Sequence, residues 1–502
     1  MTANRFSWGQ LATVARRLMR DRRGNVLILT AALMIPLIAL VGSGVDVARV
    51  SLARSRMQVA CDAASLAGRW ALSAGRNGDV VGTEARKYFN FNFPQGTYGT
   101  AAFNPSVEVS GSSSRIVNVS AETSMPMSIM GIFGAKAVTV RTACSARQDF
   151  VNTDIVLVLD TTGSMGNRAS SSDSRSKIDA MKDAVIALYD QLAPIQTQLE
   201  AAGMRLRYAV VPYSANVNIG KEMFKISPDY FRNPMPWFTC TNVNNTNNCE
   251  TRTLGWDKAT IDGADDDWPG CVEEPSTVAF PSSQASIPTN AYDLQIDNRP
   301  TSTSPQTMKW GFWVPQNIDY GWVKAGKNAA GHCPTAAVRL KSWSRGELQS
   351  YVAGLSASGQ TYHDIGMLWG GRLISNAGIF GDSPDTYSGM PVNKFVIFMT
   401  DGQLEPSSTT YSAYGLENWD KRITGGDTAS LTARHRQRFN LLCSAVKQRA
   451  SIWVVAFATG LDTSLTNCAT NPGQASVSAN STQLIQKFAE IGKNIGALRL
   501  SE

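Results

Sequence analysis

Two clusters of oxygen-bearing side chains stand out in the sequence, each at the end of an apolar run. Asp160, Thr162 and Ser164 follow the run IVLVL, and Thr400 and Asp401 follow the run FVIFM about 240 residues later. Such runs predict buried strands, and parallel strands bring their carboxyl ends to one edge of a sheet, where open α/β folds bind ligands. Hard divalent cations such as Mg²⁺ prefer oxygen ligands of these kinds. The clusters therefore predict a divalent-cation site, although each alone also has a structural interpretation as a helix cap or turn.

The two motifs together resemble the metal-ion-dependent adhesion site of von Willebrand factor A domains. That family's first motif is Asp-x-Ser-x-Ser, and the chain reads Asp160-Thr161-Thr162-Gly163-Ser164, where Thr162 keeps a hydroxyl. Thr361, in the stretch SGQTYHDIGMLWGGRLIS, matches the family's threonine from a middle loop, and Asp401 matches its later aspartate. The resemblance implies a metal site formed by Asp160, Thr162, Ser164, Thr361 and Asp401. It also implies Mg²⁺, with Mn²⁺ or Ca²⁺ as alternatives, and a coordination position left for an acidic residue of a protein partner.

The formal net charge of +7 of the 502-residue chain is confined to its beginning. Residues 1–60 contain nine Arg, no Lys and two Asp, whereas the remaining 442 residues carry 38 basic and 38 acidic side chains. The sequence shows neither a basic domain nor a recognition-helix motif, so we expect no nucleic-acid partner. A chain of this length exceeds one hydrophobic core, and we expect two or three domains.

Residues 26–45, VLILTAALMIPLIALVGSGV, are twenty uncharged and mostly apolar residues, the length of one helical crossing of a bilayer. Six arginines lie before this segment, in the basic tail of residues 1–25. The positive-inside rule keeps that tail in the cytoplasm and places the following residues on the other side. We expect a single-pass protein of a bacterial inner membrane with its bulk in the periplasm. A cleaved secretory signal is the alternative, but the apolar run is long for one.

Residues 46–148 are expected to form a helix and a small sheet. Apolar residues recur at spacings of three and four from Val50 to Ala71, which predicts a helix with a narrow buried face. Alternating residues at 107–109, 117–121 and 138–142 predict strands. The helix either packs only on this sheet or packs, as a pilin-like helix, against other subunits, and the sequence leaves both interpretations open.

The span 26–71 resembles the N-terminal segment of the TadE/TadG-like proteins of Flp (tight-adherence) pilus systems. The resemblance rests on Arg-Arg-Gly-Asn before the apolar run and on RSRMQVACD, residues 54–62, followed by Ala-Ala-Ser. Prepilins carry Glu five residues after the cleaved Gly, whereas Leu29 stands five residues after Gly24 in this chain. We therefore expect a permanent membrane anchor. The resemblance implies a role in assembling or anchoring Flp-type pili.

Residues 150–500 alternate between strands and helices, which predicts a doubly wound, mostly parallel α/β sheet of the von Willebrand A-like (Rossmann-type) class. We expect strands at 155–160, 205–214, 394–400 and 451–458, and helices at 363–375, 431–449 and 482–498. The pattern breaks over about 215–345, which indicates a large insertion rich in Cys and Trp. The aromatic residues of the insertion form either a partner-binding surface or its own core.

Cysteine usage favours disulfides in an exported domain, because the eight cysteines are even in number and none forms a Cys-x-x-Cys pair. Sequence alone does not fix the pairing of Cys61, Cys144, Cys240, Cys249, Cys271, Cys333, Cys443 and Cys468. Cys240 with Cys249 and Cys443 with Cys468 are the local pairs that we expect first.

The remaining candidates for chemistry are three histidines and an acidic turn. His363 is expected at a helix start near the metal site, His332 in a loop, and His435 on a solvated helix face. Asp265–Asp267 lack the ligand spacing of a calcium loop and are interpreted as a solvated turn. No nucleophile has a base beside it and no phosphate-binding loop is present in the sequence, so we expect a binding protein. A surface adhesin using the same metal site is the main alternative to pilus assembly, and an enzyme with its site in the insertion is a weaker one.

Overall fold

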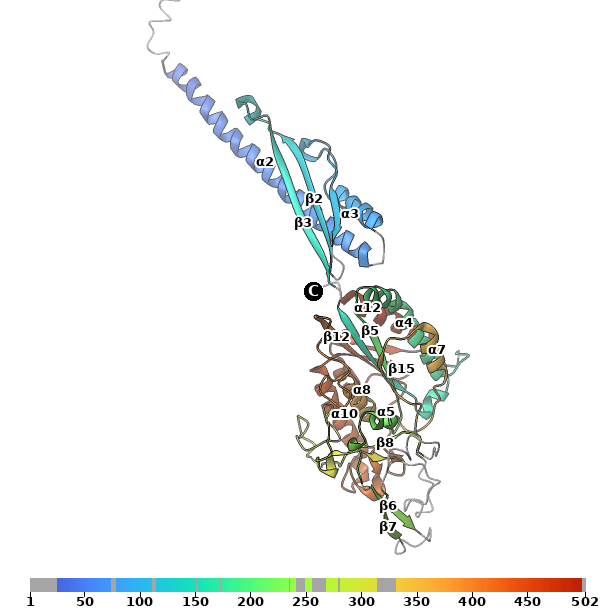
Figure 1. The fold of residues 1–502 in the computed structure, drawn as a ribbon. Coiled ribbons are helices and arrows are strands. Elements are labelled where there is room, and N and C mark those ends of the chain that lie inside the picture. The colour runs from blue at the N-terminus through green and yellow to red at the C-terminus, as the bar shows by residue number, and fades with distance from the viewer. Residues whose placement is uncertain are drawn as a thin grey trace, which may run out of the picture. The chain divides into compact units, whose positions relative to one another are not determined.

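The computed structural model describes residues 25–73, 78–110, 114–149, 151–171, 173–233, 235–240, 249–254, 268–278, 280–313 and 331–498. The chain divides into two compact units, Met1–Asp149 and Phe150–Glu502 (Figure 1). Each unit has its own hydrophobic core. The basic tail before residue 25 and the acidic turn Asp265–Asp267 lie outside the described residues.

The first unit is built on one long helix, α2 (Asn25–Ser73), which runs without a break from the predicted membrane segment into the predicted module. Many of its large apolar side chains between Val26 and Val45 are exposed, and the helix is long and apolar enough to cross a membrane. Farther along, Ala53, Met57 and Ala60 are fully buried on the face that the sequence pattern predicted. Small side chains on this face let the helix approach the sheet closely.

Helix α2 packs on an antiparallel sheet with the strand order β1-β2-β3 (Figure 1). The strands are β1 (Ser106–Ser110), β2 (Ser114–Pro126) and β3 (Ala137–Asp149), and the second helix of the unit is α3 (Gly78–Asn92). Val117, Val119 and Ala121 of β2 are buried in the core under α2. These alternate residues share one face of the strand, as the sequence predicted.

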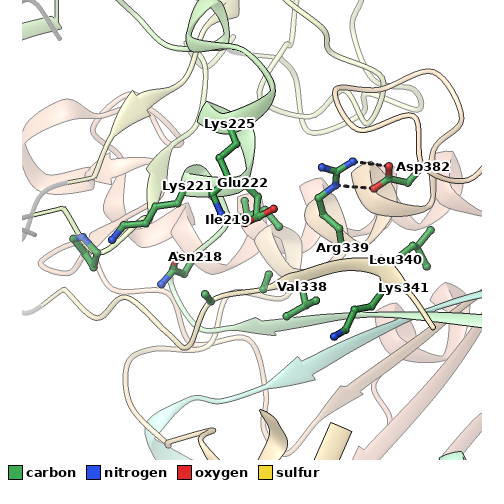
Figure 2. Close-up of a pocket in the computed structure, with 13 residues that line it drawn as sticks. Asn218, Ile219, Lys221, Glu222, Lys225, Val338, Arg339, Leu340, Lys341 and Asp382 are labelled. Atoms are coloured by element: carbon green, nitrogen blue, oxygen red, sulfur yellow. Dashed lines mark hydrogen bonds and ion pairs between the residues drawn. The ribbon is translucent and has the colours of Figure 1, made fainter. Parts of the chain in front are cut away.

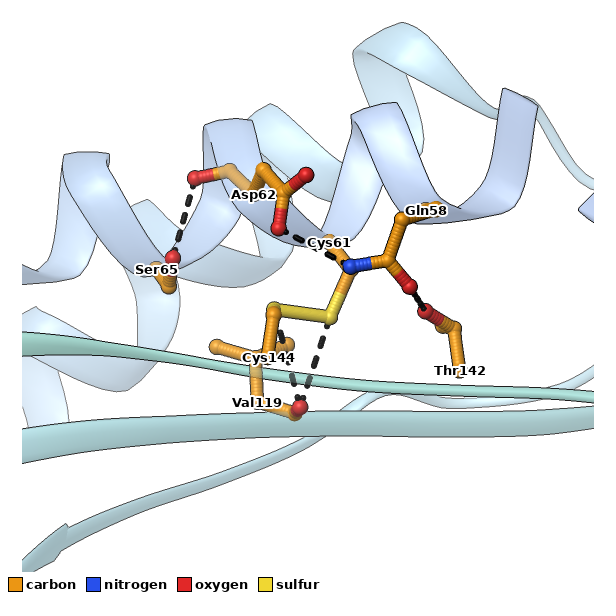
Figure 3. The surroundings of a disulfide bond; sticks show 7 residues. All are labelled: Gln58, Cys61, Asp62, Ser65, Val119, Thr142 and Cys144. Atoms are coloured by element: carbon orange, nitrogen blue, oxygen red, sulfur yellow. Dashed lines mark hydrogen bonds between the residues drawn. A yellow bond between two sulfur atoms is a disulfide. The ribbon is translucent and has the colours of Figure 1, made fainter. Parts of the chain in front are cut away.

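A disulfide between Cys61 of α2 and Cys144 of β3, with Cα atoms 5.9 Å apart, joins the helix to the sheet (Figure 3). Beside it, Thr142 Oγ1 donates to Gln58 Oε1 over 2.6 Å, and Gln58 Nε2 donates to Asp62 Oδ1 over 3.0 Å. The helix is therefore fixed to the last strand of its own sheet by one covalent bond and an adjacent polar contact.

The second unit is a mixed, mostly parallel sheet with the strand order β10-β5-β4-β12-β15-β16, and the short β11 pairs with β12. The strands are β4 (Asn152–Asp160), β5 (Leu206–Tyr213), β10 (Val338–Lys341), β11 (Thr386–Tyr387), β12 (Met390–Thr400), β15 (Ser451–Phe457) and β16 (Ala475–Ser478). Only β10 and β11 are antiparallel to their neighbours in this sheet. Every residue of the central strand β4 is buried.

Helices cover both faces of this sheet. One face bears α4 (Lys177–Ala201), α7 (Arg345–Ala353) and α12 (Ser481–Leu498), and the other bears α8 (His363–Ile374), α10 (Leu431–Lys447) and α11 (Thr463–Cys468). Side chains of β4 alternate between the two cores, with Ile155 and Leu157 in the first and Val156 and Val158 in the second. The predicted doubly wound α/β architecture is confirmed.

Short elements also lie within the expected insertion: α5 (Gly220–Ile226), β6 (Met235–Cys240), β7 (Cys249–Leu254), β8 (Val272–Glu273) and β9 (Gly311–Phe312). Three others follow β12 in the chain: β13 (Tyr411–Ser412), β14 (Gly415–Leu416) and α9 (Glu417–Asp420). Strand β10 lies within the range 215–345 but forms the edge of the main sheet. Trp268, Trp310, Trp313 and Trp343 are at most 5% exposed, so these four serve as core residues rather than as a binding surface.

Three disulfides are described. Cys443 of α10 is bonded to Cys468 of α11, as predicted, and Cys271 is bonded to Cys333 within the expected insertion. Cys240 and Cys249 stand opposite each other in the β6–β7 hairpin, but their side chains lie outside the described residues.

Candidate metal centre

The carboxyl ends of β4 and β12 bring the two sequence motifs to the same edge of the sheet. The strands are parallel neighbours, and Met399 is paired with Leu159, so Thr400 and Asp160 leave the sheet side by side. Asp160 is fully buried and Asp401 is 3% exposed. The adjacency that the sequence predicted for the two apolar runs is therefore present.

A third loop, residues 358–361, is hydrogen-bonded to both motif loops through its backbone. Gly163 N donates to Gly359 O over 2.9 Å, and Glu405 N donates to Thr361 O over 3.0 Å. Thr361 itself is 5% exposed and precedes helix α8. The loop that carries the predicted threonine thus lies between the loop after Asp160 and the loop after Asp401.

Four of the five predicted ligands form one chain of contacts. Thr162 N donates to Asp160 Oδ1 over 2.9 Å, and the hydroxyls of Thr162 and Ser164 lie 3.1 Å apart. Ser164 Oγ in turn donates to Asp401 Oδ1 over 2.8 Å. Thr361 is linked only to the loop after Asp401 among the described contacts, since its backbone O accepts from Glu405 N, four residues beyond that aspartate.

A second layer of polar side chains lies behind Asp160. Thr400 Oγ1 donates to Asp160 Oδ2 over 2.8 Å, and His363 Nε2 lies 3.0 Å from Thr400 Oγ1. The phenol of Tyr213 donates to the same carboxylate oxygen over 3.4 Å. Burial lowers the pKa of His363 to about 4, so its imidazole is neutral near pH 7. His363 therefore acts through Thr400 and does not face the cluster of predicted ligands directly.

The electrostatics of the two carboxylates differ. Burial, reinforced by the nearby charge of Asp401, raises the pKa of Asp160 from 3.8 to about 6. Asp401 has a cationic partner, because Lys177 Nζ at the start of α4 lies 2.9 Å from its Oδ2. In the described part of the chain, no ion pair is recorded between Asp160 and a cation. The site thus holds one buried carboxylate whose charge is balanced only by hydrogen bonds.

These residues fit a hard divalent cation. The cluster offers two carboxylates and two contacting hydroxyls, all oxygen donors, and one of the carboxylates is buried without a counter-ion. A buried and unbalanced carboxylate is stabilised strongly by a bound cation. Among the residues that the structure describes, no group of three or more His, Cys, Asp or Glu side chains is placed to hold a metal, so nothing there points to zinc-type ligation.

The sequence placed Thr400 in the second cluster, but it did not identify Lys177 or Tyr213 as neighbours of this site, since their contacts span 224 and 53 positions of the chain. The prediction for His435 was wrong. Its side chain is 1% exposed, and its Nδ1 lies 2.8 Å from Asp364 Oδ2, because this face of α10 packs against α8. His332 lies near Gly359, and burial lowers its pKa.

A cavity of about 600 Å³ lies between β10 and α5 and shares no residue with the candidate site (Figure 2). Most charges in its wall are paired with each other. Arg339 binds Asp382 through N–O distances of 2.8 and 2.6 Å, and Lys225 Nζ lies 2.8 Å from Glu222 Oε1. These pairs are exposed in part, so this wall presents no buried and unbalanced charge like that of Asp160.

Comparison with solved structures finds pilus proteins among the similar chains. The PilB minor pilin from Streptococcus sanguinis is 11% identical, with 80% of this chain and 79% of that chain covered and a TM-score of 0.33. The SpaC pilus adhesin from Lactobacillus rhamnosus GG is 12% identical over 80% of this chain and 35% of that chain, with a TM-score of 0.35. The von Willebrand factor domain of the type V pili tip protein Mfa5 from Porphyromonas gingivalis is 12% identical over 69% and 95%, with a TM-score of 0.31. The chain therefore spans about a third of SpaC but most of PilB and of the Mfa5 domain.

No curated protein matches the chain. Residues 24–76 match the model of the family described as "Putative Flp pilus-assembly TadE/G-like". This range contains the apolar segment and the RSRMQVACD motif on which the predicted resemblance rests. The match therefore confirms the predicted resemblance to TadE/G-like Flp pilus-assembly proteins for residues 24–76.

Proposed function

We propose that the chain is a membrane-anchored factor that assembles or anchors Flp-type (tight-adherence) pili. The single observation that supports the pilus role is the family match of residues 24–76. The long apolar helix α2 supports single-pass anchoring in a membrane. The arginines before this helix favour a cytoplasmic N-terminus, with the bulk of the chain in the periplasm of a bacterial inner membrane.

We further propose that the second unit binds its partner through a divalent cation, with Mg²⁺ the first candidate. Asp160, Thr162, Ser164, Thr361 and Asp401 would hold the cation, and the supporting observation is the buried carboxylate of Asp160 without a counter-ion. A bound cation would supply an electrophilic position that accepts a carboxylate oxygen. The partner is accordingly a protein, a component of the pilus or of its secretion machinery, that offers an exposed Asp or Glu.

The chain's own residues prepare this position in three ways. Thr162 N and Thr400 Oγ1 orient the Asp160 carboxylate by hydrogen bonds to its two different oxygens. Ser164 Oγ orients Asp401. Burial excludes water from the inner side of the site, which strengthens each electrostatic contact there. The arrangement suits reversible binding, since it aligns two carboxylates and two hydroxyls as oxygen donors around one position.

The test is a count of surface pili in a deletion strain complemented with wild type or with Asp160→Asn. The asparagine keeps the shape of the aspartate but removes the charge that a cation needs. Loss of pili on deletion, restored by wild type but not by a stably expressed Asp160→Asn protein, is the expected result. Restoration by the variant would contradict the role of the metal site, and normal pili in the deletion strain with lost surface attachment would identify an adhesin instead.

A further inference from the structure

Lys177 contacts the candidate metal site from an unfavourable position. It is the first residue of α4, its side chain is 12% exposed, and its Nζ lies 2.9 Å from Oδ2 of the fully buried Asp401 side chain. The N-terminus of a helix carries a partial positive charge, so a cation there is disfavoured and an acidic residue is preferred. The contact with Asp401 offsets this unfavourable placement and the partial burial of the ammonium group.

The position of Lys177 is fixed by its surroundings. Its backbone N donates to Asn167 O over 2.7 Å, which connects the start of α4 to the loop after Asp160. The preceding Ser176 is the helix cap and accepts from Asp179 N. The backbone of Lys177 is therefore held by the same loop that carries Thr162 and Ser164, and its ammonium group contacts Asp401.

The two oxygens of Asp401 have different partners. Oδ1 accepts from Ser164, a proposed ligand, whereas Oδ2 accepts from Lys177. Counting charges, Asp160 and Asp401 contribute −2 and Lys177 contributes +1, so the site carries −1 by itself and +1 with a divalent cation. Without Lys177 the cation-bound site would be neutral. The lysine thus changes the net charge that the loaded site presents to a ligand from zero to +1.

We propose that Lys177 is a tethered cation that holds Asp401 in place when no metal is bound and makes the loaded site select a carboxylate ligand. This inference rests on the proposed metal site and adds a determinant of ligand charge to it. Because the ammonium repels a divalent cation, Lys177 lowers the affinity for Mg²⁺. Because it leaves a net positive charge, it raises the affinity of the loaded site for an acidic group.

The experiment compares wild type, Lys177→Gln and Lys177→Arg as full-length protein in detergent. Glutamine keeps a donor for Asp401 but no charge, and arginine keeps the charge. Lys182→Gln is the matched control, because Lys182 lies on the same helix with an ion pair to Asp179, 3.3 Å away, outside the site. Mg²⁺ affinity is measured by titration calorimetry, and ligand selection by Mg²⁺-dependent binding of a labelled peptide with one Glu against the same peptide with Gln.

We expect Lys177→Gln to bind Mg²⁺ about tenfold more tightly and to lose most of its preference for the Glu peptide. Lys177→Arg and Lys182→Gln should stay within about threefold of wild type in both measurements. Equal Mg²⁺ affinity in wild type and Lys177→Gln, or an equal change in Lys177→Arg, would overturn the role of the lysine charge. Failure of wild type itself to bind Mg²⁺ would instead overturn the metal site, so the two failures are distinguishable.

Discussion

The two ends of strand β4 hold buried aspartates in opposite electrostatic situations. Asp154, near the amino end, and Asp160, at the carboxyl end, are both fully buried on the same strand. Asp154 is clamped by Arg207 through N–O distances of 2.9 and 2.8 Å, with Arg205 3.6 Å away. Asp160 is held instead by hydroxyls and a backbone N–H. The neighbouring charge that helps to raise its pKa belongs to another carboxylate, that of Asp401.

In the proposed metal site, this difference would separate an acid with a structural role from one that binds a cation. A buried charge is costly unless it is paired, and the arginines meet that requirement at Asp154. At Asp160, no side-chain cation among the described residues pairs with the buried charge. Burial alone therefore does not distinguish the two aspartates. The difference between them is the counter-ion, and the proposed metal site rests on its absence at Asp160.

Replacing Asp154 should have the largest effect on folding. Asp154→Asn leaves Arg205 and Arg207, each about 15% exposed, without their carboxylate, so the free energy of unfolding should fall by about 3–5 kcal/mol. Denaturant unfolding of the full-length protein measures this loss. Asp183→Asn is the control, since its pair with Arg175 is about half exposed and should contribute at most about 1 kcal/mol. Similar losses of unfolding free energy in the two variants would contradict the structural role of the Asp154 ion pair.

Asp160→Asn, unlike Asp154→Asn, should not lower the free energy of unfolding of the metal-free protein. With EDTA present, its free energy of unfolding should equal or exceed that of wild type, because a neutral amide replaces a buried unpaired charge. With Mg²⁺ at about 100 times its dissociation constant, wild type should gain about 2.7 kcal/mol and the variant almost nothing. Thermal unfolding with and without Mg²⁺ checks both points, and an equal gain in the variant would show that Asp160 is not a ligand.

The stability of the metal-free protein should depend on pH through Asp160. The pKa of Asp160 is about 6 in the folded protein and 3.8 ordinarily, so the folded protein binds more protons than the unfolded chain between these values. Stability from this group is therefore complete below about pH 4 and is lost as the pH rises through 6, by an amount on the order of 2 kcal/mol. Unfolding of wild type and Asp160→Asn in EDTA from pH 4 to 7 measures it. Parallel curves for the two proteins would refute this contribution.

A smaller effect is expected from His363, which positions Thr400 against Asp160. His363→Phe should fit between Phe398 and Phe439, whose rings lie 5.5 Å from that of His363, but it removes the polar contact with Thr400. We expect Mg²⁺ affinity to fall about tenfold, and His363→Gln to recover most of it. Titration calorimetry on both variants tests this. An equal loss in the two would indicate a packing role only.

The sequence predicted the main parts of the second unit because strong local signals agreed with the fold. The apolar runs before Asp160 and Asp401 are buried strands, and parallel pairing of these strands is sufficient to bring the two carboxylates together. The Thr361 loop followed from the resemblance to the von Willebrand A motif rather than from any local pattern.

Contacts between distant polar residues escaped prediction for a physical reason. His435 and Arg438 lie in the stretch ARHRQR, which reads as a solvated helix face, but both are buried against acidic partners, Asp364 and Asp293. In the sequence alone, a charged residue that pairs with a distant residue cannot be distinguished from a charged residue exposed to water. The Lys177–Asp401 pair, 224 positions apart, was missed for the same reason.

The disulfide between Cys61 and Cys144 has a mechanical consequence for a chain that would be anchored through α2. Strand β3 ends at Asp149, where the chain passes into the second unit, and tension applied to that unit enters β3 from this end. Five residues along, the Cys144–Cys61 bond offers a covalent route into α2. Force then travels down a single continuous helix into the apolar segment, and residues 62–143 carry little of the load. The load would then bypass the small sheet and leave it folded. A pull on the second unit would reach the apolar segment of α2 without lengthening the first unit.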